Sequence, residues 1–286
     1  MSSSAERSAD EHIQALLPPS LRMERHGEVV VLRLTRAAKR NALDDPTVLG
    51  IETFFSRPPS GIRAVVLDAE GEHFCAGLDL SELTERDAFE GLEHSMMWHR
   101  AFERLERGRF PVVAVLKGAV IGGGLELASA THIRVADSTT FYALPEGQRG
   151  LFVGGGASVR VPRLIGAHRV ADMMLTGRVL DAHEGQALGL SHYLTGPGEG
   201  LAHALDLAKK IAANSPVTNF AVLQALPRIA EANPAEGYLM ESLMAAVATG
   251  SAEAKERMQA FLQGRAAKVR RQRTPQPETE QQEHSS

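Results

Sequence analysis

The sequence predicts an α/β fold that is followed by a helical C-terminal region. Units of strand, loop and helix fill the first two thirds of the chain, and helical patterns fill most of the last third. The size agrees with this class, because 286 residues, 43% of them hydrophobic, suffice for a substantial core in one or two domains. The sequence contains no repeat of the solenoid type.

The N-terminal part begins with a polar segment, 1–20, which we expect to be a flexible arm with a helical turn near its end. Runs rich in valine and leucine then predict strands, and a long amphipathic pattern predicts a helix. The predicted elements are strands at 27–36 and 62–71, a helix after the loop at 39–44, a loop at 73–83 and a helix at about 86–107.

The same pattern then occurs again and gives way to helices. It comprises a strand at 111–118, a glycine loop, a helix at 125–130, strands at 132–137 and 140–146, and a glycine-rich turn that enters another helix. Beyond 167 the only strand expected is a short one at 192–196. Ser215 and Pro216 form a helix-start signal, and two further helices are predicted over about 235–269. The charged segment 271–286 is predicted to be disordered.

Composition excludes several classes of protein. A net charge of −4 and a pI of about 6.3 argue against general binding to nucleic acid or to anionic membranes. Cys75 is the single cysteine, so neither an internal disulfide nor a cysteine metal cluster can form, which fits a reducing compartment. The first residues lack the pattern of a secretory signal, and no apolar run approaches 18 residues. We therefore expect a cytoplasmic protein without a membrane span.

The stretch AVIGGGLELAS, residues 119–129, places three glycines between a strand and a short apolar helix. A phosphate-binding loop is disfavoured because no lysine follows the glycines, and the dinucleotide fingerprint fails because its last glycine is a leucine here. A tight turn for close packing remains one reading. The other is catalytic: backbone N–H groups at the start of a helix can stabilise an oxyanion, with Glu126 on the first turn nearby.

A second carboxylate follows in YALPEGQRG, where Glu146 stands after a strand and before a glycine-rich turn. Two carboxylates at the ends of strands are what general acid–base catalysis needs. Either glutamate alone would more often be an ordinary solvated residue, so the prediction depends on the pair.

Four stretches carry a resemblance to a known family: KRNAL, HFCAGLDLSEL, GGGLELA and LPEGQRGLFVGGGASVRVPRLIG. In order and spacing they resemble the crotonase (enoyl-CoA hydratase/isomerase) superfamily over about 22–268. Within it, FCAGLDLSEL, KGAVIGGGLELA, YALPEG, TNFAVLQALP and IAEANP are most similar to methylthioacryloyl-CoA hydratases, enzymes of dimethylsulfoniopropionate breakdown.

The resemblance implies a spiral of ββα units over 21–200, which would bind acyl-CoA, and a helical trimerisation region over 201–270. The assembly would be a homotrimer or homohexamer. Glu126 and Glu146 match the catalytic glutamates, the N–H groups of Leu78 and Gly123 would bind the thioester oxygen, and Gly154 would help to hold the water. The residues implied for binding the CoA substrate are Lys39, Arg40, Ala42, Leu43, Ala76, Leu78, Asp79, Leu80, Gly122 and Gly123.

The chain departs from the family pattern after the second glutamate. The usual proline and Thr-Gln pair of that loop are replaced in the run from Val153 to Val161, which leaves the substrate preference open. Near the C-terminus, Arg265 and Lys268 fall where basic groups of a neighbouring subunit approach CoA in the family, although a solvated helix face is the favoured reading.

The resemblance implies addition of water across the double bond of an α,β-unsaturated thioester, with Glu126 activating the water and Glu146 handling the Cα proton, or the reverse. On methylthioacryloyl-CoA, hydration would be followed by release of methanethiol and by thioester hydrolysis, giving acetaldehyde, CO2 and CoA. A general short-chain enoyl-CoA hydratase is the alternative, and a non-enzymatic RNA-binding protein of this fold is a more distant one. No metal is expected, and no cofactor beyond the coenzyme A of the substrate.

The remaining candidate residues have simpler readings. His73, His94 and His99 lack metal-ligand spacing, and Cys75 is expected to be a small packing residue. Met96, Met97 and Trp98 lie in the helix expected over the acyl pocket, where filling the core is the default reading and a flexible pocket for a sulfur-bearing acyl chain is the alternative. Tyr142 and Phe152 are further candidates for the wall of that pocket.

Overall fold

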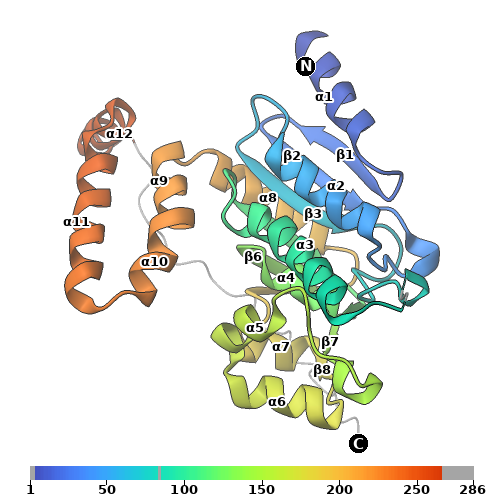
Figure 1. Ribbon diagram of the computed structural model, residues 1–286. Coiled ribbons are helices and arrows are strands. Elements are labelled where there is room, and N and C mark those ends of the chain that lie inside the picture. The colour runs from blue at the N-terminus through green and yellow to red at the C-terminus, as the bar shows by residue number, and fades with distance from the viewer. Residues whose placement is uncertain (1–3, 83–84, 266–286) are drawn as a thin grey trace, which may run out of the picture.

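The computed structural model describes residues 4–82 and 85–265 and contains two β-sheets (Figure 1). The larger sheet has the strand order β1-β2-β3-β4-β6-β9, and the smaller has the order β5-β7-β8. The large sheet contains β1 (Leu21–His26), β2 (Val29–Leu34), β3 (Ala64–Ala69), β4 (Val112–Leu116), β6 (Ile133–Asp137) and β9 (Tyr193–Thr195). The small sheet contains β5 (Ala119–Ile121), β7 (Phe141–Ala143) and β8 (Leu180–Asp181).

Most neighbouring strands run parallel, as expected of strand–helix–strand units. Among the strands of the described residues, only the β1–β2 and β7–β8 pairs are antiparallel. Strand β1 was not predicted. Half of the residues in its sequence LRMERH are charged, and it pairs with β2 through a turn at Gly27, whose φ of 67° suits glycine. The expected α/β class is confirmed, and β1 extends the sheet at its edge.

The large sheet is buried on both faces because alternate residues of each strand enter different clusters. On β2, Val30, Leu32 and Leu34 join the main core, while Val29 and Val31 join a second cluster under helix α8 (Gly200–Ala212). Helix α8 presents a row of small buried residues to this face, namely Ala204, Ala208 and Ala212. Their four-residue spacing places them on one side of the helix, so α8 lies close to the strands.

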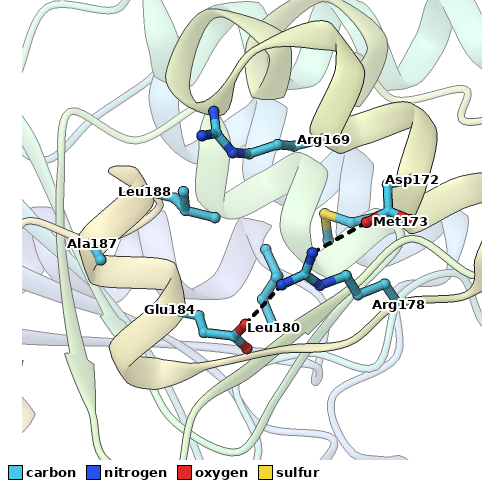
Figure 2. Close-up of a pocket in the computed structure, with 8 residues that line it drawn as sticks. All are labelled: Arg169, Asp172, Met173, Arg178, Leu180, Glu184, Ala187 and Leu188. Carbon is cyan, nitrogen blue, oxygen red and sulfur yellow. Dashed lines mark hydrogen bonds and ion pairs between the residues drawn. The ribbon is translucent and has the colours of Figure 1, made fainter.

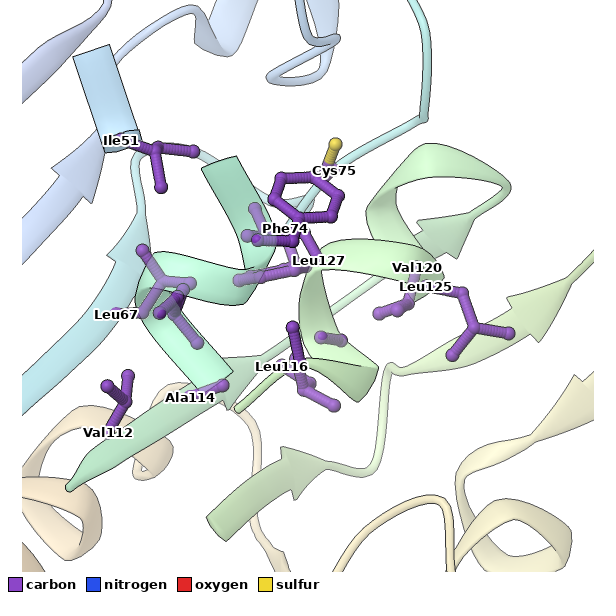
Figure 3. Packing of buried hydrophobic residues seen from close by; sticks show 14 of the residues in the cluster. Ile51, Leu67, Phe74, Cys75, Val112, Ala114, Leu116, Val120, Leu125 and Leu127 are labelled. Atoms are coloured by element: carbon purple, nitrogen blue, oxygen red, sulfur yellow. The ribbon is translucent and has the colours of Figure 1, made fainter. Parts of the chain in front are cut away.

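The main core fills the space between the other face of the sheet and three helices, α2 (Asp45–Ser56), α3 (Ala88–Glu106) and α4 (Gly123–Ser129). Figure 3 shows part of it: Ile51 of α2 and Leu127 of α4 pack with Leu67 and Leu116 of the sheet. All four side chains are fully buried. This packing fixes α4, and with it the position of Glu126, against a rigid sheet.

Helix α1 (Ser4–Leu16) occupies the segment where we expected a flexible arm. Its side chains are tied to β1: Asp10 forms an ion pair with Arg25 at 2.6 Å, and Gln14 accepts a hydrogen bond from the Met23 amide at 2.7 Å. The sequence indicated only a helical turn near the end of the arm, because the polar residues of this helix do not enter the core but serve as hydrogen-bond partners of the edge strand.

The remaining helices lie beside the small sheet or extend away from the body (Figure 1). They are η3 (Glu146–Arg149), α5 (Ala157–Ile165), α6 (Ala167–Thr176), α7 (Ala182–Leu188), α9 (Pro216–Phe220), η4 (Ala221–Ala225), α10 (Leu226–Glu231), α11 (Pro234–Gly250) and α12 (Ala252–Leu262); two short turns, η1 (Ala37–Lys39) and η2 (Leu80–Glu82), lie earlier in the chain. Since α8 packs on the sheet, the projecting part begins at α9. The division at 201 stays a prediction. Lys268 and the segment 271–286 lie outside the described residues.

Among the described residues, no helix combines the length and the apolar character needed to cross a membrane.

Candidate active site

Two glycine-containing loops meet at the start of α4. The Cys75 amide donates to the Ala119 carbonyl at 2.9 Å, and the Ile121 amide donates to the Cys75 carbonyl at 3.1 Å. This approach requires glycine at 124, where a Cβ would lie 2.3 Å from the Cys75 carbonyl oxygen. Hydrogen bonding to β5 therefore brings the loop that carries Leu78 beside the N-terminus of α4.

The amides of Leu78 and Gly123 become neighbours in this arrangement. A Cβ built on Gly123 would lie 3.3 Å from the Leu78 nitrogen. Within the part of the chain that the structure describes, neither amide donates to a protein acceptor, and both residues line the same cavity. Two unused N–H donors at one point of a cavity wall are suited to stabilising a developing oxyanion.

The segment 39–43 is hydrogen-bonded to the loop that carries Leu78. The Arg40 carbonyl accepts from the Ala76 amide at 3.0 Å, and the Leu43 amide donates to the Gly77 carbonyl at 2.8 Å. Asn41, in the left-handed region with a φ of 54°, donates its side-chain amide to two carbonyls at 2.8 Å. These bonds fix the position of the loop that carries Leu78.

Asp79 anchors the same loop by its charge. Its Oδ2 accepts from the Arg36 guanidinium at 2.6 Å and from the Lys39 ammonium at 2.8 Å. The Lys39 ammonium, together with the Ser81 hydroxyl and Arg36, holds the pKa of Asp79 well below its ordinary value. Asp79 is therefore an ionised structural residue of the loop.

The predicted CoA-binding residues fall into two groups. Ala76, Leu78, Leu80, Gly122 and Gly123 line the cavity. The other five are not part of the cavity wall, although they lie within or beside the loop that forms it: Lys39, Arg40, Ala42, Leu43 and Asp79. A role for the second group toward the rest of a CoA molecule stays a prediction.

Glu126 and Glu146 line this cavity together, and its volume is about 370 Å³. Glu126 lies on the first turn of α4 and is only 4% exposed. Its Oε1 accepts hydrogen bonds from the amides of Gly155 at 2.7 Å and Ala157 at 3.1 Å. Burial raises the pKa of Glu126, the nearby Glu146 raises it further, and the two amides oppose both effects.

Glu146 begins the short turn η3 directly after Pro145. Its Oε2 is buried and has no hydrogen-bond donor among the described residues. Burial raises the pKa of Glu146 above its ordinary value. The two carboxyl groups thus share a cavity in different settings: Glu126 accepts two amide hydrogen bonds, and Glu146 has a buried oxygen without a hydrogen-bond partner among the described residues.

Glycines provide the space for both carboxyl groups. A Cβ on Gly122 would lie 2.6 Å from Glu146 Oε1, and a Cβ on Gly155 would lie 2.6 Å from Glu126 Oε2. The Trp98 ring packs on two of the loop glycines, because a Cβ at Gly123 or at Gly155 would meet it at 2.9 Å. Trp98 therefore holds the two loops apart at the spacing that the cavity requires.

The loop after Glu146 is held by side chains that the sequence did not single out. Ser95 Oγ donates to the Gly154 carbonyl at 2.6 Å, and Arg160 Nη1 donates to the Gly155 carbonyl at 3.0 Å. Arg160 is itself paired with Glu106 at 2.8 Å. Gly154 lines the cavity as expected, while its role toward a water molecule remains a prediction. The residues of this site that were not predicted are Ser95, Gly155, Ala157 and Arg160.

The acyl-pocket candidates are divided by the structure. Trp98 and Phe152 line the cavity, and Phe152 is 72% exposed. The expectation for Tyr142 was wrong: on β7 it is fully buried and packs on Gly185, where a Cβ would lie 2.2 Å from its ring. The cavity wall contains neither Met96 nor Met97 among its described residues.

Other candidates have structural roles. His94 lines the cavity and contacts Asp45 at 2.7 Å, and His73 accepts the Ala119 amide at 3.1 Å. Burial raises the pKa of the Cys75 thiol to about 12, which makes it a poor nucleophile. In the described part of the chain, no group of three or more His, Cys, Asp or Glu side chains is arranged to hold a metal ion.

A second hollow of about 210 Å³ lies between α6, β8 and α7 (Figure 2). Arg178 bridges Asp172 at 3.3 Å and Glu184 at 2.9 Å across it. These charges neutralise one another at an exposed surface, and none of the predicted site residues lies there. The glutamate cavity is therefore the candidate active site.

Comparison with known proteins agrees with this assignment. Residues 24–272 match the family model described as Enoyl-CoA hydratase/isomerase. The chain is 30% identical to the short-chain-enoyl-CoA hydratase of Clostridium acetobutylicum, over 85% of this chain and 94% of that one. It is also 30% identical to the 2,3-dehydroadipyl-CoA hydratase of Escherichia coli, over 85% of this chain and 95% of that one.

A crystal structure from Rhodopseudomonas palustris, provisionally assigned as an enoyl-CoA hydratase, superposes with a TM-score of 0.85. It is 57% identical and covers 87% of this chain and 97% of its own. A family match over most of the chain, together with the paired glutamates and the two free amides, leads to one conclusion. This chain belongs to the enoyl-CoA hydratase/isomerase family, and it is an enzyme of that type.

Proposed function

We propose that the protein adds water across the double bond of an α,β-unsaturated acyl-CoA thioester. The observation that carries the proposal is the pair of buried glutamates in one cavity with the free amides of Leu78 and Gly123. Addition of water needs a base at the attacking oxygen, a proton source at Cα and a stabiliser for the charge on the thioester oxygen. The cavity wall offers one group of each kind.

The surroundings of the two carboxyl groups favour a division of roles. The amides of Gly155 and Ala157 donate to Glu126 and so stabilise its ionised form, which suits a base. The unpaired Oε2 of Glu146 suits a protonated acid that delivers its proton to Cα. As water attacks Cβ, Glu126 takes its proton, and the enolate oxygen accepts hydrogen bonds from Leu78 and Gly123. Proton transfer from Glu146 to Cα then completes the 3-hydroxyacyl thioester.

This chemistry uses only groups of the chain. Coenzyme A enters as part of the substrate, and the proposal includes no metal and no further cofactor. Two glutamates favour hydration over simple double-bond isomerisation, because hydration requires proton transfer at both the water and Cα.

For the acyl group we propose methylthioacryloyl-CoA, on the basis of the sequence stretches that are most similar to hydratases of that thioester. Hydration at Cβ would give a carbon bearing both hydroxyl and methylthio groups. Its collapse would release methanethiol and leave an aldehyde; hydrolysis of the thioester would then release CoA, and loss of CO2 would give acetaldehyde. The relatives in Clostridium acetobutylicum and Escherichia coli are named for short-chain enoyl-CoA and 2,3-dehydroadipyl-CoA, so a general enoyl-CoA hydratase fits equally well.

The test is a paired substrate assay with purified protein. Crotonyl-CoA and methylthioacryloyl-CoA are supplied separately, and loss of the alkene, free CoA and methanethiol are all measured. Methanethiol and free CoA from the second substrate, abolished in Glu126→Gln and Glu146→Gln, support the narrower proposal. Hydration of crotonyl-CoA without thiol release leaves the general hydratase. If the protein consumes the alkene of neither substrate, the proposed function is contradicted.

We further propose that the protein forms a homotrimer or a homohexamer through the projecting helices. Large apolar side chains stand exposed on these helices; examples are Phe220, Tyr238, Leu239, Leu243 and Phe261. Such a concentration of exposed apolar surface is typical of an interface. Sedimentation equilibrium tests it: the wild type should sediment as three or six chains and Leu243→Glu as fewer, while a monomeric wild type refutes it.

A further inference from the structure

The peptide unit between Gly154 and Gly155 is held at both ends. Its carbonyl accepts from Ser95 Oγ at 2.6 Å, and its amide donates to Glu126 Oε1 at 2.7 Å. The chain has no cis peptide bond among the described residues, so the C=O and N–H of this trans unit point in opposite directions. The orientation that Ser95 imposes on the carbonyl is therefore the orientation that directs the amide at Glu126.

The loop itself does not fix this orientation. Gly154, Gly155 and Gly156 follow one another without a side chain, so rotation of the peptide plane meets little steric resistance. Rotation by half a turn would direct the Gly154 carbonyl oxygen at the Glu126 carboxylate and replace an attraction by a repulsion. The next peptide is held separately, because the Gly155 carbonyl accepts from Arg160 at 3.0 Å.

Ser95 is itself placed rigidly. It lies on α3, whose next turn carries the buried Trp98, and the Trp98 ring packs against Gly155. Helix α3 therefore contacts the loop twice, through the Ser95 hydroxyl at Gly154 and through the indole at Gly155. The hydroxyl sets the rotation of the peptide, and the indole sets its distance from the cavity.

We propose that Ser95 is a positioning residue that stabilises and aims the Glu126 carboxylate, by locking the Gly154–Gly155 peptide with its amide toward the carboxylate. The proposal rests on the proposed function for its kinetic consequence, since there Glu126 is the base. Its physical consequence is independent of any reaction. Without the Ser95 hydroxyl, the ionised form of Glu126 loses a well-directed donor, and the pKa of Glu126 rises further.

The test compares Ser95→Ala, which removes the hydroxyl, with Ser95→Thr, which keeps it. Ser129→Ala is the matched control: its hydroxyl donates to the Glu126 carbonyl at 2.8 Å on α4 but does not touch the glycine loop. In Ser95→Ala, kcat/KM for crotonyl-CoA should fall about tenfold. The acidic limb of the pH profile of kcat/KM should move up by about one pH unit. KM should change little, and Ser95→Thr and Ser129→Ala should retain the wild-type profile.

A second measurement does not require activity. Infrared difference titration, with Glu126→Gln identifying the carboxyl band, should show the Glu126 midpoint about one pH unit higher in Ser95→Ala than in the wild type or in Ser95→Thr. An unmoved midpoint in a folded Ser95→Ala protein overturns the positioning role. If the wild type hydrates no enoyl-CoA while the midpoint moves as expected, the proposed function fails and the positioning role stands.

Discussion

Replacement of Gly155 by alanine should displace Glu126 without unfolding the protein. The new Cβ would lie 2.6 Å from Glu126 Oε2, and ordinary contact begins at 3.4 Å, so the carboxylate must retreat by about 0.8 Å. A misplacement of that order in a reacting group costs roughly 100-fold in rate, equivalent to about 2.7 kcal/mol of barrier. Overpacking against Trp98 should also lower the free energy of unfolding by about 1–3 kcal/mol.

The assay follows hydration of crotonyl-CoA by loss of its conjugated absorbance, with thermal unfolding measured in parallel. Gly154→Ala is the matched comparison, because its Cβ would meet nothing closer than Ser95 Oγ at 3.6 Å. That variant keeps its backbone amide and should remain within several-fold of wild type. If Gly155→Ala is as active as wild type and equally stable, Glu126 is not held by this loop, and the account of the site is refuted.

Three further results are expected. Because burial raises the pKa of Glu146, ionisation of this side chain destabilises the folded state as pH rises above the ordinary glutamate range. Glu146→Gln should therefore raise the unfolding temperature more at pH 8 than at pH 5. The same change should slow hydration by about 10²–10⁴-fold. Asp79→Asn leaves Arg36 and Lys39 without their shared carboxylate and should cost about 2 kcal/mol in urea unfolding at pH 7. Since the pKa of Asp79 is lowered, this deficit should shrink in acid, and a constant deficit would exclude the ion pairs as its cause. Leu78→Ala retains the amide that faces the cavity, so its kcat should stay within about tenfold of wild type; a collapse of kcat would mean that the side chain, not the amide, is needed.

The sequence was informative wherever burial dictates residue type. The valine-rich runs became β2, β3 and β4 because both faces of the sheet are covered, so that nearly every residue of these strands is buried. Strand β1 and helix α1 were not predicted correctly, since both carry many charged residues. Their order comes from tertiary partners, such as Asp10 with Arg25, which no local pattern reveals.

In the candidate site, the two glutamates were singled out by residue type and context, and the structure places both in one cavity, whereas the groups that orient them were not predicted. Ser95 stands on a helix 31 residues before Glu126 and gives no signal of its own in the sequence. Tyr142 was misplaced because a strand alternates its side chains between two faces, and the sequence near Glu146 does not say which face borders the cavity. The glycine run 154–156 was noted as a departure from the family pattern, but its function is visible only in the amides that it presents.

The positions of the glycines show why both carboxyl groups can share so small a space. Gly122 precedes the helix that carries Glu126, yet the group for which it leaves room is Glu146; Gly155 follows Glu146, yet it leaves room for Glu126. Each glutamate is therefore accommodated by the loop of the other. Because a shift of either loop displaces the carboxyl group of the opposite one, mutations in the two loops should not act independently. The double variant Gly122→Ala/Gly155→Ala should raise the activation free energy of hydration by an amount that differs from the sum of the two single effects. Strictly additive effects would show that the carboxyl groups are positioned separately.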